Sequence, residues 1–279
     1  MSRQFRFHQL DVFTSSPLRG NALAVVHAAQ ELSDAEMSAF ARWTNLSETT
    51  FLLPPVDPRA DYRVRIFTPG GELPFAGHPT LGSCQAWLLA GGRAHSPSHV
   101  VQECGIGLVT VRREGRRLAF AAPPLRRTGP LEAEVLQRAC KGLGIGVDQI
   151  LRHQWVDNGP NWAAIMLASA SQVLALKPDF AALGALKLGV LAPQAPGADT
   201  AFEVRAFVPG VGVAEDPVTG SLNAGLAVWL IGAGLAPEQY VAAQGTAIGR
   251  RGRVHISREG DEIWVGGEVV TCMDGSLSL

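Results

Sequence analysis

Two polar side chains, His78 and Asp216, each stand immediately before a proline, where the sequence predicts the start of a helix. Proline is favoured at the first helical position, because the N–H that it lacks would have no partner there. Small residues follow in both segments, Thr80-Leu-Gly-Ser and Val218-Thr-Gly-Ser, so we expect the amides of each first turn to be uncovered. A helix start carries about half a positive charge and suits a carboxylate or enolate oxygen.

These two segments belong to a longer internal duplication. Arg65, Phe67 and Pro69 recur as Arg205, Phe207 and Pro209 at a constant offset of 140 residues, and Pro79, Gly82 and Ser83 recur as Pro217, Gly220 and Ser221 at an offset of 138. A tryptophan and a glycine-rich stop follow in both copies. The repeat predicts two similar units. We expect both helix starts to face one cleft between pseudo-symmetric domains and to hold an anionic small molecule from both sides.

The elements that position these residues are a mixture of strands and helices. Residue patterning predicts strands at 5–13, 22–27, 49–53, 61–68, 100–103, 108–112, 118–121, 162–167, 202–208, 254–257 and 262–270. Ser33-Asp-Ala-Glu36 is a capping box that predicts a helix over about 34–43, and helical periodicity follows at 131–143 and 171–176. The stretch 192–197 is predicted to be a loop, and Pro123-Pro124 is the best domain boundary.

Composition excludes several classes of protein. The chain has 279 residues, 47% of them apolar, which is enough for two modest cores and argues against disorder. Its net charge of −1 leaves no basic excess for nucleic acid. We expect no membrane span, because no apolar run approaches about 20 residues, and we see no signal-peptide pattern. Four scattered cysteines without metal-binding spacing are typical of a reduced, cytoplasmic α/β or α+β protein.

Five motifs carry a resemblance to a known family. They are Asp11-Val-Phe-Thr with Gly20-Asn21, Ser47-Glu48-Thr-Thr-Phe, Phe75-Ala-Gly-His-Pro-Thr-Leu-Gly, Glu215-Asp-Pro-Val-Thr-Gly-Ser and Gln244-Gly. In this order, over nearly the whole chain, the sequence resembles the PhzF-like phenazine biosynthesis isomerases of the diaminopimelate epimerase superfamily. The resemblance implies two domains, each a mixed barrel-like sheet around a central helix: 1–124 completed by a C-terminal strand at about 268–279, and 125–267. It also implies a homodimer.

The resemblance further implies a cofactor-independent isomerase that moves a proton on a small carboxylate-bearing substrate, with no metal. Glu48 would be the acid/base, with His78, Asp216 and Ser221 around the substrate and amides near Gly77 and Gly220 holding the anion. Asn21 and the loop from Asp157 to Asn161 would add polar contacts. The chemistry is consistent: apolar neighbours would raise the pKa of Glu48 toward the working pH, and the helix start favours neutral His78.

Two alternatives stay open. A weakly active binding protein could retain the same cleft, and a two-base epimerase could use Asp216 in place of a thiol. The epimerase relatives use two cysteines, whose places resemble Gly77 and Asp216 here. None of Cys84, Cys104, Cys140 and Cys272 occupies them, so a thiol racemase is disfavoured. Arg65 and Arg205 are predicted scaffold residues, the roles of Asn161, Glu72 and Glu215 are open, and no residue identifies the substrate or links it to phenazine synthesis.

Overall fold

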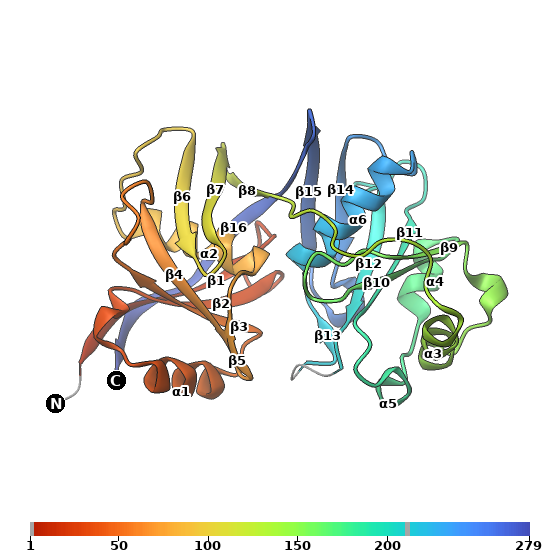
Figure 1. Cartoon of the computed structure of the whole chain (residues 1–279), viewed down its shortest axis with the longest axis horizontal. Coiled ribbons are helices and arrows are strands. Elements are labelled where there is room, and N and C mark those ends of the chain that lie inside the picture. The colour runs from red at the N-terminus through yellow and green to blue at the C-terminus, as the bar shows by residue number, and fades with distance from the viewer. Residues whose placement is uncertain (1–2, 210–212) are drawn as a thin grey trace. The chain divides into compact units, whose positions relative to one another are not determined.

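The computed structural model describes residues 3–209 and 213–279 and divides the chain into two compact units. The first comprises Met1–Ala121 and Gly266–Leu279, and the second comprises Ala122–Val265. The last strand therefore begins in the second unit and ends in the first, where it pairs with the N-terminal strand (Figure 1). Boundaries at 124 and 268 are what the resemblance implies, and they stay a prediction.

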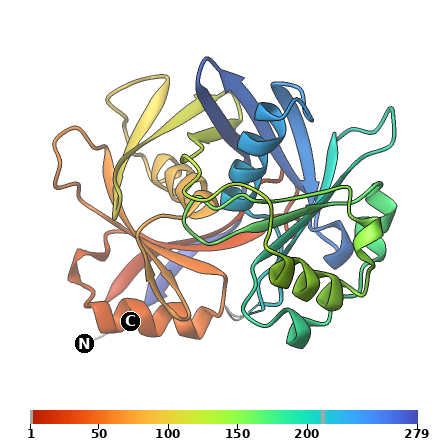
Figure 2. The ribbon, with the colours of Figure 1, turned by 45° about the vertical axis from the view of Figure 1, so that its right-hand side comes forward.

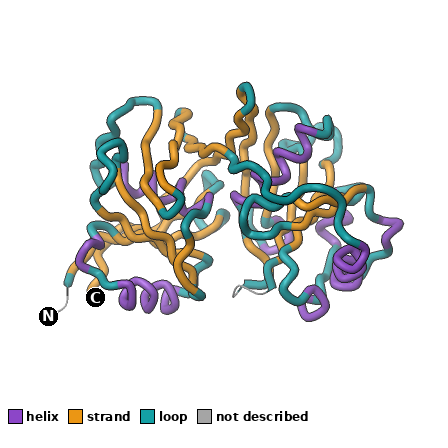
Figure 3. Tube along the Cα trace, in the orientation of Figure 1, coloured by secondary structure: helices purple, strands orange, loops and turns teal. Residues whose placement is uncertain are grey.

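The first unit is a closed eight-stranded barrel in the order β1-β2-β3-β4-β6-β7-β8-β16, with β16 pairing back to β1. Strands dominate this unit in Figure 3. The strands are β1 (Gln4–Val12), β2 (Asn21–Val26), β3 (Glu48–Leu53), β4 (Tyr62–Thr68), β6 (His99–Cys104), β7 (Gly107–Glu114), β8 (Arg117–Ala121) and β16 (Glu262–Ser278), and β5 (Gly71–Leu73) forms a hairpin with β4. The sheet is mixed, because β2–β3 and β4–β6 are parallel.

Helix α2 (Gly77–Leu89) fills this barrel (Figure 2). It contacts β1, β2, β3, β4, β6, β7 and β8, and most of its residues are buried. Gly82 permits the close approach of helix and strand, because a Cβ there would lie 2.5 Å from the Leu23 side chain in β2. A helix surrounded by protein has no polar face, which explains why its sequence lacks amphipathic periodicity.

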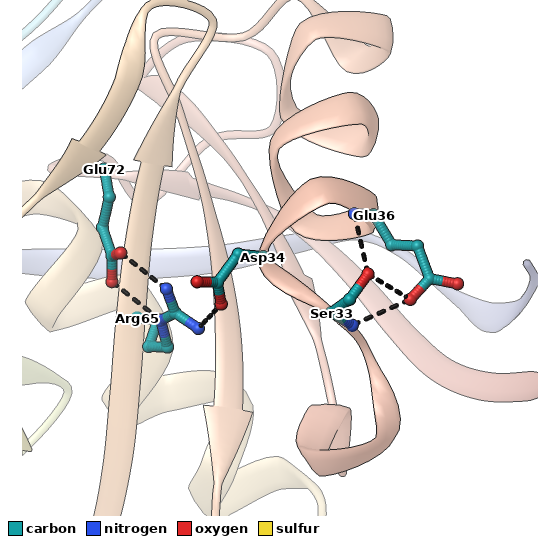
Figure 4. A network of polar contacts seen from close by, with 5 residues as sticks. All are labelled: Ser33, Asp34, Glu36, Arg65 and Glu72. Atoms are coloured by element: carbon teal, nitrogen blue, oxygen red, sulfur yellow. Dashed lines mark hydrogen bonds and ion pairs between the residues drawn. The ribbon is translucent and has the colours of Figure 1, made fainter.

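Helix α1 (Asp34–Thr44) covers the outside of the barrel with the short helix η1 (Ala29–Glu31). Its Phe40 and Met37 join Phe5, Phe51 and Phe67 in a buried cluster. The predicted capping box is present: the Ser33 hydroxyl accepts from the Glu36 amide at 3.3 Å, and the Glu36 carboxylate accepts from the Ser33 amide at 2.8 Å (Figure 4).

The second unit has a mixed sheet in the order β15-β14-β12-β11-β10-β9, with β13 paired to β12. Its strands are β9 (Arg152–Trp155), β10 (Ala163–Met166), β11 (Leu188–Pro193), β12 (Phe202–Phe207), β13 (Glu215–Asp216), β14 (Gln239–Gln244) and β15 (Gly252–Glu259). Its helices are α3 (Ala133–Leu143), η2 (Val147–Gln149), α4 (Ala170–Ala175), α5 (Phe180–Leu183), α6 (Gly220–Gly232) and η3 (Thr246–Ile248). Helices α3, α4 and α5 supply leucine and valine side chains to one core with β10, β11 and β12.

Helix α6 is buried on nearly all sides, as α2 is. Leu222 in α6 packs against Gly189 of β11, and Gly225 lies against the backbone of Val156, where a larger residue would clash. The predicted α/β fold class is confirmed by these units. The duplication is also visible in the fold, because β4-β5-α2 and β12-β13-α6 are each a strand, a short hairpin strand and a buried helix. Residues 210–212 of the second copy lie outside the described residues.

Most predicted elements are confirmed within a few residues, but the loop predicted at 192–197 begins too early. Ala192 and Pro193 continue β11, pairing with Glu203 and Phe202 of β12. Proline is tolerated there because β10 pairs with β11 only as far as Leu191, so the N–H that Pro193 lacks would have no ladder partner. Patterning also missed β9, which has only 4 residues. It missed β11 and β14 because their apolar residues do not alternate with polar ones.

Candidate active site

Three predicted site residues of the first unit lie together: Asn21, Glu48 and His78. The Asn21 side-chain nitrogen lies 3.4 Å from Nδ1 of His78, and Nε2 of His78 lies 3.4 Å from Oε2 of Glu48. Asn21 begins β2 and Glu48 begins β3, and these strands are parallel, so both residues stand at the same end of the barrel. Helix α2 starts at this end and places His78 between them.

His78 is neutral in this environment. Its side chain is 5% exposed, and burial lowers the pKa of the imidazole to about 3. The Asn21 amide donates to Nδ1, which makes Nδ1 the acceptor and leaves the ring proton on Nε2. That proton faces the carboxylate of Glu48, whose side chain is 16% exposed. The arrangement therefore places a neutral N–H group 3.4 Å from the carboxylate oxygen of a partly exposed glutamate, without hydrogen-bond geometry between these two atoms.

The start of α2 differs from the sequence prediction. The helix begins at Gly77 with Ala76 as its N-cap, so Pro79 is the third helical residue and His78 lies within the first turn. Proline fits this place too, because the first four N–H groups of a helix have no intrahelical partner. The Thr80 hydroxyl donates to the Ala76 carbonyl at 2.9 Å and holds the turn closed.

The corresponding region of the second unit shows a larger difference. The sequence suggests that Pro217 opens helix α6 and that Asp216 caps it. In the structure the helix begins at Gly220, and Thr219 is its N-cap. The reason is that Asp216 belongs to β13 and pairs with Ala206 of β12, which keeps it extended. Asp216 still contacts the helix start, because the Thr219 hydroxyl donates to its Oδ2 at 2.6 Å.

Ser221, in the first turn of α6, is surrounded by groups from the 157–161 loop and its flank. The Trp162 indole N–H donates to the Ser221 hydroxyl at 3.0 Å, and the Asn158 amide donates to the Ser221 carbonyl at 2.9 Å. Asp157 organises the loop by accepting from the backbone N–H groups of Gly159 and Asn161 at 2.7 and 2.6 Å. The structure thus gives Asn161 a backbone role, with φ of 66°. The predicted roles of Ser221 and Gly220 toward a substrate stay predictions.

The structure explains Glu72 and Glu215, whose roles were open. Each accepts two hydrogen bonds from the duplicated arginine of its unit, at 2.8 and 2.6 Å for Arg65–Glu72 and 2.9 and 2.7 Å for Arg205–Glu215. Arg65 also pairs with Asp34 of α1 (Figure 4). Both glutamates occupy the same register, opposite Phe67 and Phe207. They are scaffold residues.

The cysteines lie in environments that raise their pKa. All four are free, and burial raises the pKa of Cys84, inside the barrel on α2, to about 12. Burial also raises the pKa of Cys104, Cys140 and Cys272. Within residues 3–209 and 213–279, no group of three or more His, Cys, Asp or Glu side chains could hold a metal ion. In the same residues, no helix has the length and apolar character needed to cross a membrane.

Fold and site together define an α/β protein of epimerase-like architecture, and comparison with known proteins identifies its family. The sequence matches the family described as "Phenazine biosynthesis-like protein" (PhzC-PhzF) over residues 10–275, and the chain belongs to that family. An Enterococcus faecalis protein of the same family has the same fold, with a TM-score of 0.84, 24% identity and coverage of 99% of this chain and 100% of that one.

Two curated relatives extend the comparison. "Antisense-enhancing sequence 1" of Schizosaccharomyces pombe is 36% identical, over 96% of this chain and 97% of its own. "Trans-2,3-dihydro-3-hydroxyanthranilate isomerase" of Pseudomonas chlororaphis is 34% identical, over 97% of this chain and 98% of its own. The chain is an isomerase.

Proposed function

We propose that this isomerase moves a proton between two carbons of a small carboxylate-bearing substrate, with Glu48 as the proton carrier and without a cofactor. The observation that supports this most directly is the Asn21–His78–Glu48 arrangement of the first unit. It gives a carboxylate that is partly accessible and an adjacent N–H donor that stays neutral. Such a pair can exchange a proton and stabilise a neighbouring oxygen without a charged partner.

The proton and electrons balance within the substrate. The Glu48 carboxylate removes a proton from an activated carbon, and the electron pair of the broken C–H bond shifts along the conjugated system. The distal carbon then takes the proton back from the Glu48 carboxyl. Because burial lowers the pKa of His78 to about 3, the imidazole is a poor store for this proton. We assign His78 the role of an N–H donor to Glu48 or to a substrate oxygen.

The remaining roles are proposed from the motifs and the duplication. Backbone amides at Gly77 and Gly220 would hold the substrate carboxylate or the developing enolate, which suits a helix start. Asn21 would orient His78, as its contact with Nδ1 supports. Asp216 and Ser221 of the second unit would bind polar groups of a substrate.

The test uses the compound that the Pseudomonas chlororaphis relative is named for, trans-2,3-dihydro-3-hydroxyanthranilate. Product formation and deuterium incorporation are followed by NMR in deuterated water. Glu48→Gln keeps the size of the side chain but cannot exchange a proton, so turnover should fall by roughly 10² or more while binding survives. Glu134→Gln, the same change at an exposed position of α3, is the matched control and should leave turnover unchanged.

The outcomes separate the alternatives. Deuterium incorporation at an unchanged rate in Glu48→Gln would remove Glu48 from the mechanism and favour the epimerase alternative that uses Asp216. Binding by the wild type with neither product nor exchange, for this compound and for related small carboxylates, would favour the binding protein.

A further inference from the structure

Gln244, the last residue of β14, forms hydrogen bonds with every polar group of its buried side chain. Its Nε2 donates to the Asp216 carbonyl at 3.0 Å and to the Thr219 hydroxyl at 2.9 Å. Its Oε1 accepts from the Thr219 amide at 3.0 Å and from the Asn223 side-chain nitrogen at 2.8 Å. One side chain thus ties β13 to the start of α6.

The orientation of this amide is unambiguous. A backbone carbonyl can only accept and a backbone N–H can only donate. The Asp216 carbonyl therefore requires the nitrogen of Gln244 on its side, and the Thr219 amide requires the oxygen. Rotating the Gln244 amide by 180° would place its nitrogen against the Thr219 N–H, so that two donors meet. It would also place its oxygen against the Asp216 carbonyl, so that two acceptors meet.

The direction of the Thr219 proton follows from this orientation. Since Gln244 donates to the Thr219 oxygen, the hydroxyl proton points elsewhere, and Oδ2 of Asp216 lies 2.6 Å away. Thr219 is the N-cap residue of α6, yet its side chain makes no capping hydrogen bond to the helix. The hydroxyl is therefore committed to Asp216 and is not needed to begin the helix.

The backbone after Gln244 supports the same arrangement. Gly245 has φ of 87°, a left-handed conformation that favours glycine, and a Cβ there would lie 2.6 Å from the Pro217 carbonyl. Gly245 thus permits Pro217, the residue after Asp216, to lie against the end of β14. Asp216 is held through its own carbonyl, through its neighbour and through its carboxylate.

We propose that Gln244 and Thr219 are positioning residues that keep Asp216 an ionised hydrogen-bond acceptor. Asp216 then accepts a hydrogen bond from a hydroxyl or amine group of the substrate and does not deliver a proton. The substrate role of Asp216 rests on the proposed function, whereas the effect of the network on Asp216 does not. A hydroxyl that can donate only toward the carboxylate stabilises the charged form, as hydrogen bonds to carboxylates generally do.

The test compares Thr219→Val, which keeps the branched shape without the hydroxyl, with Thr219→Ser, which keeps the hydroxyl. The ionisation of Asp216 is followed directly by carboxyl ¹³C NMR, assigned with Asp216→Asn. We expect the midpoint of the Asp216 titration to rise by about one pH unit in Thr219→Val, which is a tenfold change in the ionisation constant. Thr219→Ser should stay near the wild type. The acid limb of the kcat/KM profile for trans-2,3-dihydro-3-hydroxyanthranilate should move in the same direction.

Thr219→Ala provides a second variant without the hydroxyl and without a branched side chain, should the valine fail to fold. An Asp216 midpoint in the hydroxyl-free variant equal to that of the wild type would overturn the inference, and so would an equal shift in Thr219→Ser. If the midpoint moves as expected while Glu48→Gln still turns over normally, the positioning network stands and the proposed proton carrier fails.

Discussion

The duplicated arginine–glutamate pairs allow a matched test of what burial does to an ion pair. Arg205 and Glu215 are 6% and 7% exposed, whereas Arg65 and Glu72 are 23% and 41% exposed. Both pairs are bidentate with similar distances and occupy the same places in their units. The two pairs differ in exposure and in the further partners of the arginine, Asp34 for Arg65 and backbone carbonyls for Arg205. The perturbation is the same in both: Glu215→Gln and Glu72→Gln.

The two changes should have very different costs. Glu215→Gln leaves the Arg205 guanidinium buried with neutral partners, the carbonyls of Val173 and Leu176 at 3.2 and 2.8 Å. Breaking a buried pair in this way costs about 3–5 kcal/mol. Glu72→Gln should cost only about 0.2–1 kcal/mol, because water reaches Arg65 and Asp34 still pairs with it.

Native-state hydrogen exchange is the suitable assay, because each glutamate lies in a different unit and exchange reports on each locally. Glu215→Gln should speed exchange of the most protected β12 amides by about two orders of magnitude or more, since 1.4 kcal/mol is a factor of ten. Glu72→Gln should speed exchange in β4 by less than about tenfold. Equal effects of the two changes, or a larger effect of Glu72→Gln, would refute the reasoning from burial.

Two further predictions concern pH and assembly. Burial lowers the pKa of His78 to about 3, against about 6.5 in the unfolded chain, so the unfolded state binds more protons and folding stability falls as the pH drops from 6.5 toward 3. Between pH 7 and pH 5 the free energy of unfolding of the wild type, measured with urea, should fall by about 2 kcal/mol more than that of His78→Gln. An equal pH dependence of the two proteins would contradict this prediction. The family resemblance implies a homodimer, so light scattering at micromolar concentration should return twice the chain mass of 29.6 kDa; a mass of one chain would remove that prediction.

The sequence predicted the parts of the fold that depend on local patterning. The capping box, the alternating strands and the two-copy organisation all depend on residues close in the chain or on a constant offset. The start of α6 was wrong because it depends on distant partners: β13 pairs with β12, and Gln244 reaches the Thr219 amide from β14. No spacing rule contains that information.

The candidate site likewise contains residues that could be predicted from the sequence and residues that could not. Glu48 and His78 are far apart in the sequence, and only the resemblance predicted that they act together. The structure brings them to 3.4 Å because β3 and α2 begin at the same end of the barrel. Trp162 was not singled out, since a tryptophan without repeated spacing gives no chemical signal. Asn158, Thr219 and Gln244 were noticed only as parts of a loop or a motif.

The two copies keep one frame but differ in the chemistry at their helix starts. The frame is the Arg–Glu pair on a strand and its hairpin, with each arginine over a phenylalanine ring at 5.1 and 4.9 Å. In the first unit the helix start carries a neutral imidazole beside a carboxylate, whereas in the second it fixes a carboxylate with a hydroxyl donor. A two-base epimerase needs two groups that both exchange protons. Glu48 beside a neutral imidazole in the first unit suits a proton shift by a single carboxylate, which is the reaction proposed for it.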